Sequence, residues 1–400
     1  MARQNFSVIE NAQIDIRKCD DRVTVVGWDE AQTVAVDGEA RQEGNTIFVQ
    51  DLERVSVRVP RSATVLITDC DGDVRVEGVS GRVEMANVGD VVLRELREVI
   101  ARAVNGALVA KDVQSLTGQG TWDGDVALRG VEQMQVETID GDASIGNLGT
   151  ANIKTLDGDL AVRGVRGALT LGDVDGDVTV RELEGRLTIE RVGGDFAASE
   201  LRGVVDAQDV EGDAVLTFAQ VAELKLRADG DVVIRLPEGS NAEIELDALR
   251  GDLMVSGAVK VIEQDDSHLR GTLGTGEVKM QAESTRGDLV FNGGTPERVR
   301  VEHREHWQGE DWGAFGRRIA DEVRENVTRS LGNVRVEARV KRHHRRHERD
   351  HERARREEPV AAPPQPRAPA EGSSERQAIL DAIARGELSV DDAIRKLRGE

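Results

Sequence analysis

A Gly-Asp pair that returns at nearly constant intervals is the feature that most constrains how this chain can fold. Successive pairs are 17 or 18 residues apart, and Asn105-Gly106 takes the place of one of them. The pairs stand at residues 72–73, 89–90, 124–125, 141–142, 158–159, 176–177, 194–195, 212–213 and 230–231. Self-similarity at a fixed period indicates a stacked-repeat protein, in which each repeat contacts only its neighbours.

The apolar residues of one unit indicate the kind of repeat. In residues 178–195 they occupy the first, third, sixth, tenth, twelfth and fifteenth positions, a nine-residue pattern written twice. Apolar residues two apart are typical of short β-strands, and helical spacing is absent. We therefore expect an all-β fold, a parallel β-solenoid (β-helix) of 17–18-residue rungs with irregular β caps, followed by a helical C-terminal tail. In each bend Gly is expected to supply a positive φ, and Asp to bond the following backbone amides.

Changes in period and composition divide the chain into five segments. We expect an N-terminal β cap over 1–68, a solenoid body with its C-terminal β cap over 69–294, and an amphipathic helical segment over 295–340. A basic, His-rich and Pro-rich linker over 341–374 and a helical hairpin over 375–400 follow. Nearly all of the net charge of −22 lies in the body, which disfavours binding of nucleic acid or anionic lipid there.

Several short motifs accompany the repeats, namely Val57-Arg-Val-Pro60, residues 65–74 and Leu236-Pro-Glu-Gly239. With the Gly-Asp rungs they resemble the bacterial putative-adhesin β-strand-repeat family, a domain of unknown function also found in envelope-stress proteins of the Lia type. The hairpin over 375–400 resembles a short helical segment that often accompanies such domains as an interaction or oligomerisation module. The resemblance implies no catalytic residues, and its adhesin label implies export.

Stacked rungs would place the Asp side chains of the Gly-Asp pairs in a column. Calcium could bridge them, as in nonapeptide β-rolls, but those rolls need two glycines and an Asp in every nine residues. We therefore expect bend chemistry, with no metal and no cofactor. Four positions after the Asp slot stand Arg94, Lys111, Arg129, Arg163 and Arg181, which are expected to form cross-rung ion pairs.

Other chemistry finds little support. Aromatic residues make up 2% of the chain, so the body lacks the sugar-stacking platforms that polysaccharide-active enzymes on β-solenoids use. We expect no enzyme activity, no catalytic residue and no small-molecule substrate. Cys70 and Trp122 share a slot that is apolar in other units, and both are expected in the core, as is Cys19 on structural grounds.

The tail carries the features that favour binding of another polypeptide. The spacing of apolar residues from Trp312 to Leu331 predicts an amphipathic helix, which either caps the last rung or makes a self-association or membrane contact. The hairpin offers only a small apolar face, far short of what independent folding requires. The candidate interaction residues are Trp312, Phe315, Ile379, Ile383, Leu388, Ile394 and Leu397.

Residues 341–356 hold eight Lys or Arg and four His. A solvated basic helix accounts for this run, and binding of anionic lipid or nucleic acid is a weaker alternative. Together the patterns predict a non-enzymatic scaffold that self-associates or contacts another protein through its C-terminal helices, and the family resemblance implies a link to envelope-stress regulation. The alternative is an exported or surface-associated adhesin-like binding protein. With no signal peptide or transmembrane segment recognised, we expect a cytoplasmic location, or peripheral association with a membrane.

Overall fold

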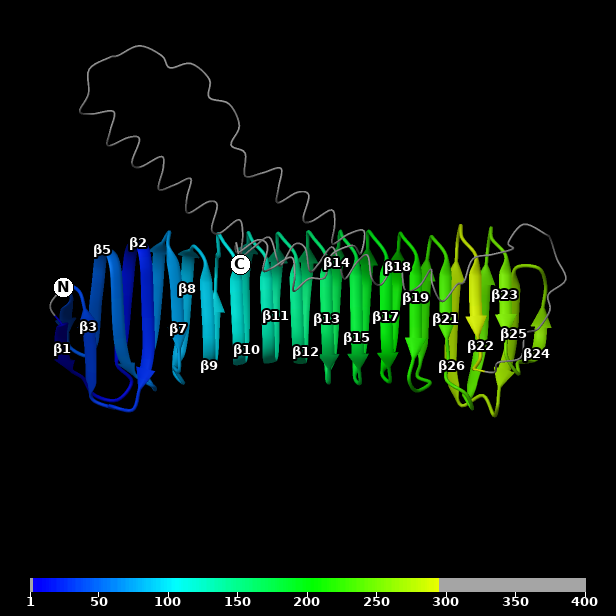
Figure 1. Ribbon diagram of the computed structural model, residues 1–400, viewed down its shortest axis with the longest axis horizontal. Helices are drawn as coiled ribbons and strands as arrows, with labels where there is room; N and C mark the ends of the chain where they lie inside the picture. Colours follow the sequence, from blue (N-terminus) through cyan, green and yellow to red (C-terminus); the bar gives the residue numbers. More distant parts are fainter. Residues whose placement is uncertain (1–2, 295–400) are drawn as a thin grey trace, which may run out of the picture. The chain divides into compact units, whose positions relative to one another are not determined.

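The computed structural model describes residues 3–294, which form 27 β-strands and no helix. The strands of this part stack along one axis into an elongated body (Figure 1). The segments expected over 295–340, 341–374 and 375–400 lie outside the described residues. Within residues 3–294 the predicted all-β solenoid is confirmed, and no helix there could cross a membrane.

A typical rung consists of two strands joined by bends. One rung is formed by β15 (Val178–Leu183) and β16 (Arg186–Val192), and the preceding one by β13 (Leu160–Val165) and β14 (Ala168–Val174). β15 pairs in parallel with β13, and β16 pairs in parallel with β14. Stacking therefore builds two parallel sheets, which we call sheet A (with β13 and β15) and sheet B (with β14 and β16).

The same alternation extends over the regular region. β9 to β12 are long strands that pass through a bend, so each contributes to both sheets. The other strands of this region are β6 (Thr64–Cys70), β7 (Asp73–Glu77), β8 (Arg82–Val88), β9 (Val91–Ala101), β10 (Leu108–Trp122), β11 (Val126–Ile139), β12 (Ala143–Leu156), β17 (Phe196–Leu201), β18 (Val204–Val210), β19 (Ala214–Phe218), β20 (Leu224–Ala228) and β21 (Val232–Arg235).

The core lies between the two sheets. Aliphatic side chains fill it because every second residue of a strand points inward. The six positions predicted from residues 178–195 are all 0% exposed: Val178, Val180, Leu183, Leu187, Ile189 and Val192. Cys70 and Trp122 are fully buried and Cys19 is almost so, which confirms their expected place in the core.

The N-terminal end departs from sequential stacking. It contains β1 (Arg3–Ser7), β2 (Gln13–Trp28), β3 (Thr33–Asp37), β4 (Arg41–Glu43) and β5 (Thr46–Pro60). β2 lies between β5 on one side and β6 and β7 on the other, and all of these pairings are parallel. Parallel rungs thus already occur inside the segment over 1–68, which we expected to be an irregular cap. The sequence did not show them because β3 and β4 separate β2 from β5, so the repeat period is longer there. β3 and β4 pair antiparallel with β5, and β1 pairs antiparallel with β3.

The C-terminal end also contains a rung that is stacked out of chain order. It contains β22 (Ala242–Ala248), β23 (Leu253–Ser256), β24 (Lys260–Gln264), β25 (His268–Leu273), β26 (Val278–Ser284) and β27 (Leu289–Asn292). β26 lies between β20 and β22, and β27 lies between β21 and β23. The last described rung is therefore inserted between two rungs that precede it in the sequence. β25 and β24 continue sheet B as antiparallel strands.

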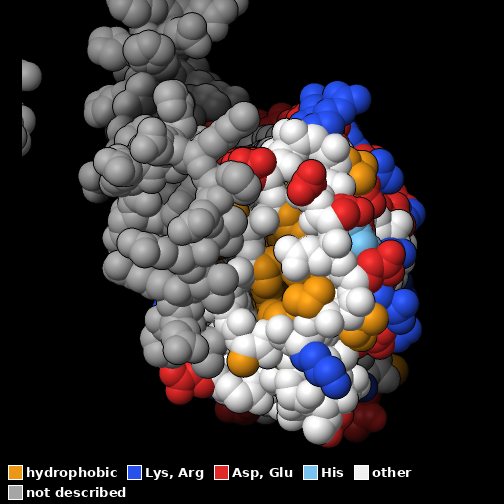
Figure 2. Space-filling view, turned by 90° about the vertical axis from the view of Figure 1, so that its right-hand side faces the viewer, with side chains coloured by type: hydrophobic (Ala, Val, Ile, Leu, Met, Phe, Trp, Pro, Cys, Tyr) orange, Lys and Arg blue, Asp and Glu red, His pale blue; other side chains and the backbone are white. Residues whose placement is uncertain are grey.

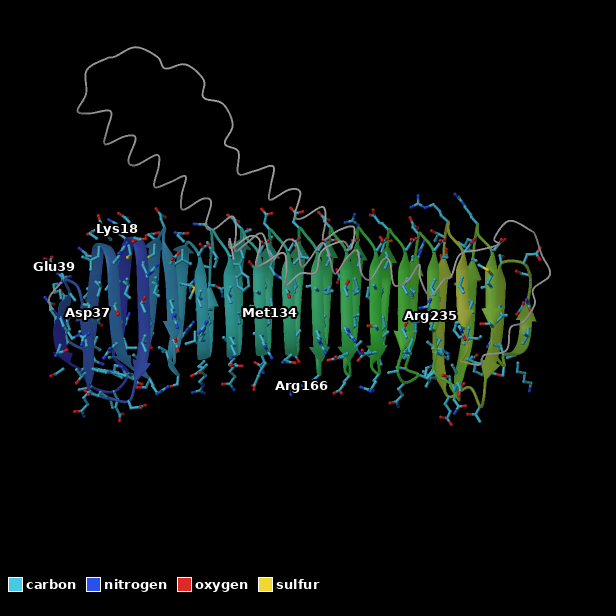
Figure 3. All side chains as sticks on the ribbon, in the orientation of Figure 1. Lys18, Asp37, Glu39, Met134, Arg166 and Arg235 are labelled. Atoms are coloured by element: carbon cyan, nitrogen blue, oxygen red, sulfur yellow. The ribbon has the colours of Figure 1, made fainter. Side chains whose placement is uncertain are left out.

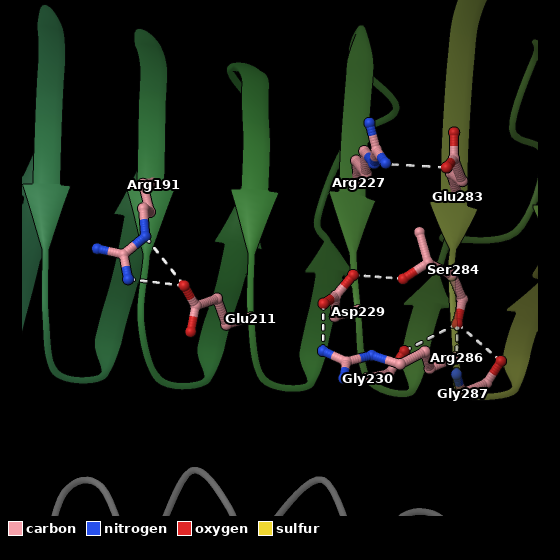
Figure 4. Close-up of polar contacts among 10 residues, drawn as sticks. Arg191, Glu211, Arg227, Asp229, Gly230, Glu283, Ser284, Arg286 and Gly287 are labelled. Carbon is pink, nitrogen blue, oxygen red and sulfur yellow. Dashed lines mark hydrogen bonds and ion pairs between the residues drawn. The ribbon is translucent and has the colours of Figure 1, made fainter.

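Polar contacts hold the inserted rung in place (Figure 4). The Ser284 hydroxyl is fully buried and lies 2.8 Å from the carbonyl oxygen of Gly230 and 2.7 Å from that of Gly287. Arg286 forms an ion pair with Asp229 on the neighbouring rung. The contacts of Ser284 with Gly230 and of Arg286 with Asp229 join residues 54 and 57 positions apart, so they secure a stacking order that differs from chain order.

Candidate interaction surface

The Asp residues of the Gly-Asp pairs form a ladder along one edge of the body. From Asp125 onward, Oδ1 of one Asp accepts a hydrogen bond from the backbone N–H of the Asp in the next rung, at 2.7–3.1 Å. Before it, Oδ1 of Asp90 accepts from the N–H of Ala107 at 3.0 Å. The ladder follows stacking order through the inserted rung, from Asp231 to Asp288 to Asp252. The carboxylates do bond backbone amides, but on the next rung rather than on the following residues of their own bend.

The glycines of this edge serve close approach between rungs. A Cβ on Gly212 would stand 2.6 Å from the carbonyl oxygen of Gly194, and one on Gly176 would stand 2.6 Å from that of Gly158. Of the Gly-Asp glycines only Gly141 has a positive φ, of 153°. The expectation that glycine supplies a positive φ at these bends is therefore wrong for the others, because the crowding comes from the neighbouring rung.

Positive φ recurs instead in the opposite bend, just before the third inward residue of most units, and in the first rungs it also occurs before the Gly-Asp edge, at Asp69 and Asn87. It is carried there mostly by acidic or amide residues, as in Asp112 and Asn147, whose side chains tolerate this conformation better than most. The position is occupied by Glu95, Asp112, Gly130, Asn147, Gly164, Glu182 and Glu200, with φ between 52° and 76°.

The charge of the Asp ladder is partly desolvated. Burial, as the largest cause, raises the pKa of Asp159 and of Asp213 above the ordinary value, and the neighbouring Asp carboxylates of the ladder add to the rise. The hydrogen bond from the next rung acts in the opposite direction. Among residues 3–294, no group of three or more His, Cys, Asp or Glu side chains is arranged to hold a metal ion.

The basic column forms two of the expected cross-rung ion pairs. Arg163 binds Glu182 and Arg181 binds Glu200, each with an Nη2 to Oε1 distance of 2.7 Å. Lys111 instead pairs with its sequence neighbour Asp112 at 3.6 Å. These pairs are exposed to solvent and contribute little to stability, and we assign them a structural role between neighbouring rungs.

The outer side of sheet A carries a column of uncharged side chains. These residues are one position beyond the first inward residue of each unit, and their strand pairings place them in register over eleven rungs. We call this column the outer stripe; it comprises Val92, Val109, Ala127, Ser144, Ala161, Thr179, Ala197, Val215, Val233, Val290 and Met254. It runs between the Asp ladder and the basic column. Our sequence interpretation missed it, although aligning the units at their second position would have shown it.

The corresponding column on sheet B is polar, which shows that the outer stripe is not a general property of the repeat. From β10 onward it consists of Thr117, Gln135, Asn152, Thr170, Thr188, Asp206, Lys225, Gln281, Glu245 and Arg270. Figure 3 shows Lys18 and Arg166 at the two opposite long edges of the body, which mark the two kinds of bend between sheets A and B.

Part of the outer stripe has the character of a buried surface. Ala197, Val215 and Val233 are 6%, 7% and 2% exposed, although strand alternation puts them on the outer side of sheet A. In the middle of the stripe, the Thr179 hydroxyl is buried and has no hydrogen-bond partner in the part of the chain that the structure describes. Aliphatic side chains in such a continuous row are typical of a surface that contacts another polypeptide.

A second apolar surface lies at the C-terminal end of the described body. Figure 2 looks onto this end, where hydrophobic side chains gather among charged ones. Val261 and Ile262 on β24 are 47% and 61% exposed, and Leu249 is 57% exposed. β24 is short and carries Lys260 and Glu263, which is a common way to keep a sheet edge from pairing with another chain.

The two cysteines have no reactive environment. Burial raises the pKa of the Cys70 thiol to about 12 and also raises that of Cys19. The candidate interaction residues expected in the tail, from Trp312 to Leu397, all lie outside the described residues.

Comparison with known proteins gives one family. No curated protein matches the chain. Among solved structures, a putative cell adhesion protein from Clostridium sporogenes aligns over 73% of this chain and 98% of its own, at 7% identity and a TM-score of 0.14, a likeness too low to support any argument. The model of a repeat family of unknown function, Toastrack DUF4097, matches residues 7–291, nearly the whole solenoid and well over half of the chain. The chain belongs to the Toastrack DUF4097 family.

Proposed function

We propose that this protein is a non-enzymatic scaffold, in which a rigid β-solenoid carries C-terminal segments that bind another protein or a second copy of the chain. The outer stripe is the observation that most supports a binding role for the solenoid, because a long uncharged row on one sheet is suited to contact with a polypeptide segment of this chain or of another. The polar side chains of the Asp ladder and of the Arg–Glu pairs are engaged in contacts between rungs, which is a structural use.

The proposal assigns assembly to the hairpin over 375–400. Its apolar residues are too few to form a core of their own, and the Pro-rich segment before it acts as a semi-rigid spacer. We therefore infer that the hairpin buries its apolar face on association. Ile379 and Ile383 on its first predicted helix, and Leu388, Ile394 and Leu397 after them, are the residues that would make this contact.

Deletion of residues 371–400 tests this assignment. We expect the truncated chain to keep the melting temperature of the full chain and to lose oligomer mass in light scattering. In the full chain, Ile383→Asp on the apolar face of the hairpin should also lower the oligomer mass. The matched control is Arg385→Asp, which should leave the oligomer mass unchanged. A deletion that lowers the melting temperature of the β body would identify the hairpin as a cap and contradict the proposal.

The proposal places the scaffold in the cytoplasm, with regulatory contact in the envelope-stress response, and keeps an exported adhesin-like protein as the alternative. Cell fractionation separates the two. Recovery in the soluble cytosol or with the inner face of the membrane supports the scaffold. Recovery at the cell surface, accessible to added protease in intact cells, supports the adhesin-like protein.

A further inference from the structure

We propose that the outer stripe is the docking site of the chain's own predicted helix over 312–331, which lies along sheet A and not across the end of the solenoid. The inference goes beyond the assembly role assigned to the hairpin over 375–400. It rests on where the described chain ends, on the dimensions of the two apolar surfaces, and on the charges that border the stripe.

The exit point of the chain favours sheet A. The described residues end at Gly294, two positions after β27, and β27 contributes Val290 to the outer stripe. Residues 295–311 can span at most roughly 3.3 Å each, or about 56 Å in total. This is enough for a helix that starts at Trp312 to begin over any of the last rungs.

The length of the helix distinguishes the two surfaces. Twenty residues from Trp312 to Leu331 make a helix about 30 Å long. The end of the solenoid is only about one strand long, roughly 23 Å for seven residues, and about 10 Å thick. The outer stripe crosses eleven rungs, which at about 4.8 Å per rung gives roughly 48 Å. The helix therefore overhangs the end of the solenoid, whereas it fits within the stripe.

The flanking charges match as well. The Asp ladder borders the stripe on one side, and Arg163, Arg181 and Arg235 lie on the other. In the predicted helix, Arg317 and Arg324 fall on one edge of the apolar face. They are seven residues apart, about 10.5 Å along a helix, which is close to the spacing of every second rung of the ladder.

The apolar surfaces also match in kind. The helix presents Phe315, Ile319 and Val323 at a spacing of four residues, and the stripe offers small side chains such as Ala161 and Ala197, between which larger ones can pack. Docking would account for the low exposure of Val215 and Val233, which strand alternation places on the outer side of sheet A. It would leave the hairpin over 375–400 at the end of the Pro-rich spacer.

Thiol labelling in the full chain tests the proposal. The native Cys19 and Cys70 are buried, so the wild-type protein should not react with a maleimide. We expect Val215→Cys in the stripe to react slowly, and Thr188→Cys on the polar outer side of sheet B to react quickly. Adding Val323→Asp on the apolar face of the helix should raise the labelling rate of Val215→Cys at least tenfold. Thr328→Asp, on the opposite side of the helix, should change it less than twofold.

Each other occupant of the stripe gives a different result. Equal labelling of Val215→Cys with and without Val323→Asp, at a rate near that of Thr188→Cys, would show an open stripe and overturn the proposal. Protection that increases with protein concentration, together with a doubled mass in light scattering, would show a second copy on the stripe and also overturn it. The readout does not depend on the 371–400 deletion, so failure here is distinguishable from failure of the assembly role.

Discussion

The Gly-Asp edge brings the backbone of one rung against the backbone of the next. Glycine is needed because a Cβ would meet a carbonyl oxygen or a carboxylate of the preceding rung. Asp is needed because its Oδ1 accepts the N–H of the next Asp. Both residues therefore act between rungs, which explains why their spacing equals the length of a rung.

Gly212→Ala should lower the stability of the protein. The new Cβ would stand 2.2 Å from Oδ1 of Asp195 and 2.6 Å from the carbonyl oxygen of Gly194. Since backbone must move to relieve this overlap, we expect a loss of about 1–3 kcal/mol, measured by urea denaturation followed by circular dichroism. Gly146→Ala is the matched control, since its Cβ would meet nothing closer than 3.9 Å. Equal effects of the two substitutions would contradict the crowding explanation.

Asp213→Asn should stabilise the protein at neutral pH but not in acid. Burial raises the pKa of Asp213 above 3.8 in the folded state. Between 3.8 and the raised value the folded chain binds more protons than the unfolded chain, so stability falls as the pH rises through this window. Asn keeps an oxygen acceptor for the N–H of Asp231 and removes the charge.

The measurement for Asp213→Asn is the free energy of unfolding at pH 7 and below pH 3.8. We expect the variant to exceed the wild type at pH 7 and the difference to vanish below pH 3.8. A wild type that is more stable than the variant at pH 7 would mean that the ladder needs its charge.

The inward-facing residues could be predicted from the sequence, whereas the structural roles of Gly and Asp in the bends could not. Alternation within a strand is local information, so Val180 and Ile189 were assignable to the core from spacing alone. The crowding at Gly212 depends on a residue 18 positions earlier and becomes visible only once the rungs are stacked. The outer stripe was missed for a different reason: each rung contributes only one residue to it, so it is visible in the sequence only when the units are aligned at that position.

Among the elements, the inserted rungs at the two ends are the least sequential part of the fold. β2 lies between β5 and β6, and β26 lies between β20 and β22. An end rung held between two neighbours pairs on both of its sides, so its backbone groups are satisfied better than those of a terminal rung. We infer that insertion protects the ends of the solenoid against fraying and edge-to-edge pairing.

Ser284→Ala should weaken the inserted C-terminal rung. The substitution removes the buried hydroxyl next to the carbonyl oxygens of Gly230 and Gly287. Leaving buried polar groups without partners costs about 1–3 kcal/mol, and hydrogen exchange should accelerate in β26 and β27 before it does in β15. Ser144→Ala on the outer stripe, where neighbouring rungs already carry Ala, serves as the control. Unchanged exchange in β26 would show that backbone pairing alone holds the rung.

The insertion could not be predicted from the sequence. The regular Gly-Asp spacing ends after residue 231, and further pairs follow at 251–252 and 287–288, which indicates an irregular segment but not its stacking order. The step from Asp231 to Asp288 spans 57 residues, and no local pattern specifies such a partner. The strands of this region, in contrast, could be predicted, because the alternation of apolar and polar residues along a strand is local information.

At the scale of the whole molecule, the solenoid behaves as a row of equivalent units. Each rung pairs only with the rungs before and after it in the stack, and from β12 to β17 the strands of sheet A keep one register. Stability is then close to a sum of rung and interface contributions. The outer stripe and the Asp ladder are the two features that depend on every rung keeping the same orientation.

Removal of one complete rung tests this equivalence. Deleting residues 178–195 removes β15, β16 and one Gly-Asp pair, and joins Asp177 to Phe196. The new neighbours preserve the pattern: β13 can pair with β17 in the register that β15 has now, and Asp213 takes the place of Asp195 after Asp177 in the ladder. Since the terminal rungs are untouched, we expect a folded chain with a melting temperature within about 5 °C of the wild type, the scale of 1 kcal/mol in a domain of modest size.

Deleting only residues 178–186 is the control, because half a rung turns every later Gly-Asp pair to the opposite edge and interrupts both the ladder and the outer stripe. This shorter deletion should melt at least 10 °C lower than the full-rung deletion, and a reversed order of the two melting temperatures would show that the rungs are not interchangeable.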